Sequence, residues 1–161
     1  MKKLLDPNIK NYYSCFFMVF FLHTSFCMVL NAQNPGEEFT RNDAIELVMT
    51  KISPPAHHDG PVSIFVHDEK LQPGDVIEPF FSKDDIRINI QAPSWLAWID
   101  DHPTAGFAHP TRLVIINQQT GEYDIHHFQW WPLLNGTNLF MSDSARNNRN
   151  IMIYSDLNII R

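Results

Sequence analysis

The alternation of apolar and polar residues between residues 105 and 131 predicts a β-hairpin. Residues 111–117 form the first strand, a run rich in β-branched side chains, and residues 122–129 return as the second. Gly121 lies in the short connection and can adopt the positive φ that such turns need. We expect this hairpin to form the centre of a sheet.

A helical pattern precedes the strands and covers residues 40–52. Its apolar side chains recur at spacings of three and four residues: Ile45, Val48, Met49 and Ile52. Thr40 is suited to be the N-cap, and Asp43 stands at the position of the capping-box acid. Pro54 ends the pattern. The sequence therefore predicts a short amphipathic helix that packs on a sheet.

Other alternating segments predict further strands. They cover residues 62–67, 85–91, 94–99, 137–141 and 151–154. Residues 85–91 have the clearest alternation, with isoleucines on one face and polar side chains on the other, as in an antiparallel sheet wetted on one side. Asn135-Gly136 is a strong signal for a two-residue hairpin turn. One helix followed by many short strands predicts an α+β domain, with the N-terminal helix packed on a mainly antiparallel sheet.

The first 32 residues have the features of a cleavable signal peptide. Lys2 and Lys3 give a basic start, an apolar run extends over residues 12–30, and the small Ala32 precedes the expected cleavage point. We therefore expect a secreted or periplasmic protein. The alternative is an uncleaved membrane anchor, because about 20 apolar residues are enough to span a bilayer.

The remaining chain divides into three parts. Residues 33–39 are a polar connector, and residues 40–141 are the α+β domain. Residues 142–161 are a polar linker followed by a final strand. This strand either closes the sheet or begins a further domain that follows in a longer protein.

Cysteine content and charge narrow the possible functions. Cys15 and Cys27 both lie in the leader, so the mature chain has no disulfide, catalytic thiol or thiolate metal site. The leader also contains three of the 12 basic and one of the 18 acidic residues, which leaves a net charge of −8. No basic surface remains for phosphate groups, so nucleic acid is a poor candidate partner.

Histidines suggest metal chemistry, but their spacing does not support it. Seven of the eight lie beyond the leader, and none forms the HExxH pattern or an i, i+4 pair. His126 and His127 are adjacent on a strand and therefore point to opposite faces. The sequence also has no GxSxG serine motif and no glycine-rich phosphate loop. We expect no metal, no cofactor and no catalytic residues in this domain.

Four residues at the two ends of the hairpin are candidates for binding: His109, Arg112, Trp130 and Trp131. If the strand continues, Trp130 and Trp131 face opposite ways, so that one is buried and the other is exposed. The other two tryptophans, Trp95 and Trp98, are expected in the core.

Arg112 is suited to a bidentate ion pair with a carboxylate. Its candidate partners are Asp100, Asp101 and Asp124. The expected role of this pair is structural.

Two segments resemble PepSY-like and propeptide-type exported domains. These segments contain the helix FTRNDAIELV and the strand and turn VIINQQTGEY, and the resemblance covers residues 40–52 and 113–123. The resemblance implies a small α+β module that precedes a secreted peptidase and inhibits it or helps it to fold.

Three functional hypotheses follow. The first is a non-catalytic exported domain that acts as a pro-region, an inhibitory module or a docking module for a downstream or separate secreted enzyme. The second is a carbohydrate-binding module that uses exposed tryptophans. The third is a metal-dependent enzyme built on the histidines.

Overall fold

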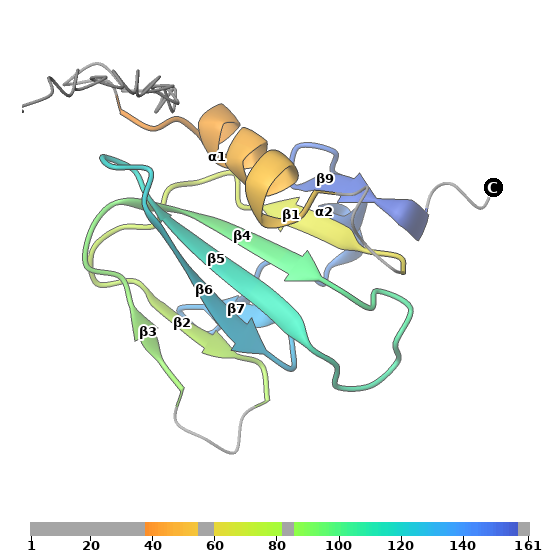
Figure 1. The fold of residues 1–161 in the computed structure, drawn as a ribbon. Coiled ribbons are helices and arrows are strands. Elements are labelled where there is room, and N and C mark those ends of the chain that lie inside the picture. The colour runs from red at the N-terminus through yellow and green to blue at the C-terminus, as the bar shows by residue number, and fades with distance from the viewer. Residues whose placement is uncertain (1–37, 55–59, 82–85, 158–161) are drawn as a thin grey trace, which may run out of the picture. The chain divides into compact units, whose positions relative to one another are not determined.

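The computed structural model describes residues 38–54, 60–81 and 86–157, all within the unit Gln33–Arg161. The predicted leader and most of the connector lie outside the described residues. The described chain is α+β and consists mostly of antiparallel sheet. Figure 1 shows one helix lying against a large sheet, with a smaller sheet behind.

The first element is the helix α1 (Arg41–Leu47), which continues into a π-helical turn, η1 (Val48–Ile52). Thr40 caps α1 in a complete capping box, because its hydroxyl accepts from Asp43 N while the Asp43 carboxylate accepts from Thr40 N. Ala44 and Val48 are fully buried against the sheet.

The larger sheet has five strands in the order β6-β5-β4-β1-β9. Their bounds are β1 Ser63–Val66, β4 Ser94–Asp100, β5 Thr111–Asn117, β6 Tyr123–Phe128 and β9 Met152–Ser155. The predicted hairpin is present as β5 and β6, with Gly121 at φ 69° in the turn. Its expected central place is wrong, because β4 is the middle strand and β6 is at the edge.

The smaller sheet has the order β3-β2-β7-β8. Its strands are β2 Val76–Pro79, β3 Ile88–Asn89, β7 Pro132–Leu134 and β8 Thr137–Asn138. The Asn135-Gly136 turn joins β7 and β8 as predicted, with both residues at positive φ. The long strand predicted at residues 85–91 shortens to β3, and Ile86 is exposed. The strand is short because, among the described strands, β3 pairs with β2 alone and at two positions. The predicted faces hold over the rest of the segment: Ile88 is half-buried and Ile90 buried, whereas Asn89 and Gln91 are exposed.

The two sheets and the helix form three layers with two apolar cores. The side chains of Trp95, Ala97 and Ile99 pack toward α1. The intervening Leu96 and Trp98 pack toward the smaller sheet. Every residue of β4 is therefore buried. The one antiparallel sheet that the sequence predicts is divided into two sheets, and β4 is covered on both faces.

The C-terminal part of the described chain belongs to the same fold. Residues 142–150 were expected to be a linker, but they contain the short helix α2 (Asp143–Asn147), which Ser142 caps. Ala145 of α2 is buried. The final strand, β9, pairs with β1 and completes the larger sheet, the first of the two alternatives considered for it.

Candidate functional site

Arg112 forms a structural ion pair at the start of β5. Its guanidinium donates to both carboxylate oxygens of Asp101, at 2.9 and 2.6 Å. It also donates to the carbonyl oxygen of Ile52 and to the hydroxyl of Ser53, at 3.3 and 3.0 Å. Of the three candidate partners, Asp101 is the one used. Arg112 thus links the β4–β5 loop to the end of η1, with four of its five N–H groups donating within the domain.

His109 is held within the same loop. Its Nε2 lies 2.8 Å from Oδ1 of Asp100, and its Nδ1 lies 2.7 Å from the carbonyl oxygen of Phe107. The same Asp100 oxygen accepts from the backbone N–H of His102. Although a His–Asp pair occurs in many catalytic sites, the two ring nitrogens of His109 face Asp100 at the end of β4 and the carbonyl oxygen of Phe107 in the β4–β5 loop. The arrangement shapes the loop and offers no nucleophile.

Trp130 and Trp131 connect β6 to β7, where the chain crosses from the larger sheet to the smaller one. Both are half-buried, so the expectation of one buried and one exposed tryptophan is wrong. The reason is that the strand does not continue through them: β6 ends at Phe128 and β7 begins at Pro132. Trp95 and Trp98 are buried, as predicted.

Two phenylalanines join this tryptophan pair. Phe80 and Phe81 follow β2, and the backbone N–H of Phe80 donates to the carbonyl oxygen of Trp131. The ring centroids are 4.8 Å apart for Phe80 and Trp131, 5.4 Å for Phe81 and Trp130, and 5.2 Å for the two tryptophans. We call these four residues the aromatic patch. Phe81 is its most exposed member, at 63%.

Sequence reasoning missed the two phenylalanines of the patch. The signal was the pair Phe80-Phe81 directly after Pro79, at the end of a strand. Nothing local connects this pair with Trp130 and Trp131, about 50 residues away, because the contact depends on the pairing of β2 with β7.

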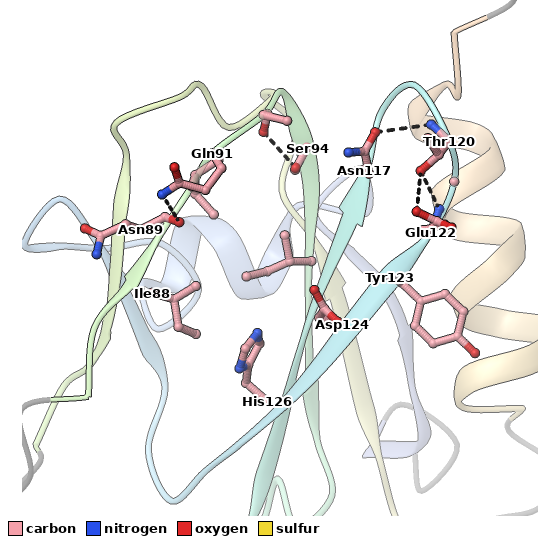
Figure 2. Close-up of a pocket in the computed structure, with 14 residues that line it drawn as sticks. Ile88, Asn89, Gln91, Ser94, Asn117, Thr120, Glu122, Tyr123, Asp124 and His126 are labelled. Carbon is pink, nitrogen blue, oxygen red and sulfur yellow. Dashed lines mark hydrogen bonds between the residues drawn. The ribbon is translucent and has the colours of Figure 1, made fainter.

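A cleft of about 770 Å³ opens between β3 and the strands β5 and β6. Figure 2 shows Ile88 on one wall facing Asp124 and His126 on the other. Ile90 and Ile115 contribute apolar surface. No hydrogen bond joins the Asp124 or His126 side chain to another part of the chain that the structure describes. The polar turn side chains around the rim are mostly bonded locally, as in the contacts of Asn117 with the backbone of residues 119 and 120.

The candidate residues form separate groups. The two tryptophans lie in the aromatic patch, His109 is bound to Asp100, and Arg112 points toward η1. His126 and His127 lie on opposite faces of β6, as the alternation predicts, since they pair with Leu113 and Arg112. His57 and His58 lie outside the described residues.

Residues 38–54, 60–81 and 86–157 contain no group of three or more histidine, cysteine, aspartate or glutamate side chains placed to hold a metal ion. Among the same residues, no helix has both the length and the hydropathy needed to cross a membrane.

Comparison with known proteins identifies no relatives: no family model, curated protein or solved structure matches the chain significantly.

Proposed function

We propose that this domain is a non-catalytic docking module that binds another protein through the aromatic patch. The observation that carries the proposal is the contact of four large rings, two of them from each of two distant chain segments, at a partly exposed site. Exposed tryptophan and phenylalanine side chains gathered in one place are typical of the energetic centre of a protein interface.

Ring geometry favours a protein over a glycan. The interplanar angle is 88° between the two tryptophans, 73° between Phe81 and Trp130, and 71° between Phe80 and Phe81, whereas Phe80 and Trp131 are tilted by 31°. Three of the four contacts are therefore edge-on. Edge-on packing of this kind gives an uneven apolar surface. A sugar ring stacks on the open face of a flat aromatic platform, whereas an uneven surface suits interdigitating side chains.

Charge and hydrogen bonding support the same proposal. His109 and Arg112, the polar groups most suited to chemistry, are engaged in the β4–β5 loop and at the end of η1. The patch, in contrast, presents surface that burial against a partner would remove from water. Each 100 Å² of apolar surface so buried contributes roughly 2.5 kcal/mol before the costs of association are subtracted.

The proposed partner is an exported enzyme. This part of the proposal rests on the leader-like residues 1–32 and on the resemblance to propeptide-type domains. It predicts that the protein recovered outside the cytoplasm begins at or near Gln33, which N-terminal sequencing would test. A chain that retains its first 32 residues in the membrane fraction would favour the anchored alternative.

The docking surface can be tested with a photo-crosslinking amino acid in place of Phe81, used in the native host. We expect one dominant crosslinked protein from the exported fraction. Its purified form should bind the wild type and lose at least about tenfold in affinity when Phe81→Ala and Trp130→Ala are combined.

Tyr123→Ala is the matched control, because Tyr123 is an exposed aromatic residue at the opposite end of β6. Equal weakening by this control would reject the patch as the binding site. Binding of a glycan panel that depends on Trp130, with no protein crosslinked at position 81, would instead support the carbohydrate hypothesis.

A further inference from the structure

The outer edge of β6 is unpaired among the described strands, although β6 has six residues. In an antiparallel pair, alternate residues exchange backbone hydrogen bonds with the neighbouring strand. The N–H of Asn117 donates to the carbonyl oxygen of Glu122, which makes this a bonded pair. By alternation, Asp124 and His126 are bonded to β5, whereas Tyr123, Ile125 and His127 direct their backbone groups outward.

Two side chains on one face of β6 are apolar or aromatic and exposed to solvent. Tyr123 and Ile125 are 43% and 39% exposed. On the opposite face, Asp124 and His126 make no hydrogen bond to other described residues. The edge therefore presents backbone groups that no other described strand bonds, together with exposed apolar side chains. It also presents the Asp124 carboxylate and the His126 imidazole without a hydrogen-bond partner among the described residues.

We propose that two copies of this chain associate by pairing their β6 strands antiparallel about a twofold axis at Ile125. In this register each Ile125 exchanges backbone hydrogen bonds with its copy, and each Tyr123 does so with His127 of the other chain. The outward-directed backbone N–H and C=O groups of Tyr123, Ile125 and His127 thus all form hydrogen bonds with the second chain. The two five-stranded sheets become one continuous sheet.

Charge selects this register over its neighbours. Pairing about Ile125 puts the Asp124 carboxylate of each chain directly opposite the His126 imidazole of the other, as a non-hydrogen-bonded pair in which side chains approach closely. A shift of one step toward Tyr123 would oppose the two Asp124 carboxylates, and a shift toward His127 would oppose the two His126 rings. Only the central register pairs unlike groups twice.

The alternative is that Asp124 and His126 prevent β6 from pairing with another strand. Charged side chains on an edge strand are one of the means by which proteins prevent strand pairing. The proposal is therefore tested by the oligomeric state of the protein and by exchanging the two residues. Asp124 lies opposite Ile115 of β5, and His126 lies opposite Leu113. Exchanging Asp124 and His126 therefore creates no like-charge pair within the sheet of one chain.

The experiment is sedimentation equilibrium of the protein, purified in the form in which the cell accumulates it, from micromolar to near-millimolar concentration. The mass of the wild type should rise from one to two chain masses with concentration. An interface formed by two six-residue strands is small, and small interfaces associate weakly. His126→Asp should remain at one chain mass, since it places two acids opposite each other. The double exchange Asp124→His with His126→Asp should restore the twofold mass.

Glu69→His is the control, since Glu69 is an exposed acid in the β1–β2 connection, and it should dimerise as the wild type does. Circular dichroism of each variant confirms that it is folded. A wild type at one chain mass throughout would overturn the proposal and identify the edge as guarded. A dimer unaffected by His126→Asp but lost in Phe81→Ala would overturn it too, and would assign association to the aromatic patch.

Discussion

At the residue scale, the polar side chains that most resemble catalytic groups serve to hold loops. Arg112 binds Asp101 and the end of η1, and His109 binds Asp100. The residue types were recognisable from the sequence because arginine and aspartate near a strand end commonly pair. The choice of Asp101 among three acids depends on the path of the β4–β5 loop, which local sequence does not specify.

Replacing Arg112 with lysine is expected to destabilise the fold. Lysine retains the charge but lacks the planar fork that bonds Asp101, Ile52 and Ser53 together. We expect a loss of about 1–2 kcal/mol in the free energy of unfolding, measured by urea denaturation.

Arg87→Lys is the matched control, because Arg87 is exposed and lies 3.4 Å from Glu78 in a single contact. Its effect should stay within about 0.5 kcal/mol. Equal losses for the two variants would show that the Arg112 interactions add no stability.

His67 is expected to make stability depend on pH. Burial lowers the pKa of His67, an effect only partly offset by Asp68. Because the unfolded chain keeps the ordinary pKa, about 6.5, it binds more protons than the folded chain below that pH. Stability is therefore retained above about pH 6.5 and declines as the pH falls toward the lowered pKa.

The measurement is the urea midpoint of the wild type and of His67→Asn between pH 8 and pH 5. The difference between the two proteins should change across this range, because only the wild type carries this contribution. A constant difference would contradict the expected role of His67.

At the scale of elements, the β5–β6 hairpin is the feature best predicted from local sequence. Its strands, its two faces and its glycine turn follow from alternation and turn chemistry. The turn also has a tertiary contact: Phe39 donates its backbone N–H to the carbonyl oxygen of Gln118 and accepts at its own carbonyl from Trp95 Nε1. Phe39, the last residue of the connector, is thereby held against the hairpin.

Gly121→Ala should weaken the hairpin for two reasons. Gly121 has φ +69°, and a Cβ added there would lie 2.8 Å from Cδ2 of Phe39. We expect a loss of about 1–3 kcal/mol in the free energy of unfolding, measured by urea denaturation.

Gly106→Ala serves as the control, since a Cβ at Gly106 meets no atom within 4 Å. Its effect should stay within about 0.5 kcal/mol. If both substitutions were equally tolerated, the turn would be free to rearrange.

At the scale of the whole described domain, β4 joins two cores. Trp98 lies at the centre of the core between the sheets, with its ring centroid 5.0 Å from that of Phe65 and 5.7 Å from that of Phe140. Adjacent side chains of the same strand fill the core under α1. Because one strand serves both cores, the two layers are expected to unfold together.

Trp98→Ala should cost about 3–5 kcal/mol, the range for removing a large buried aromatic side chain. Urea unfolding followed by circular dichroism and by tryptophan fluorescence should give the same midpoint, in the wild type and in the variant alike. Separate midpoints would show that the smaller sheet unfolds independently.

The sequence by itself determined the features that depend on neighbours along the chain. These are the Thr40 cap, the alternation of β5 and β6, and the Gly121 and Asn135-Gly136 turns. They follow from periodicity and backbone preference, which act over a few residues.

Only the tertiary structure decided what depends on contacts between distant segments. It separated the strands into two sheets, put β4 rather than the hairpin at the centre, and brought Phe80 and Phe81 to Trp130 and Trp131. A strand buried on both faces has no polar alternation to reveal its place, so its neighbours cannot be inferred from its own pattern. The candidate binding surface arises where those neighbours meet.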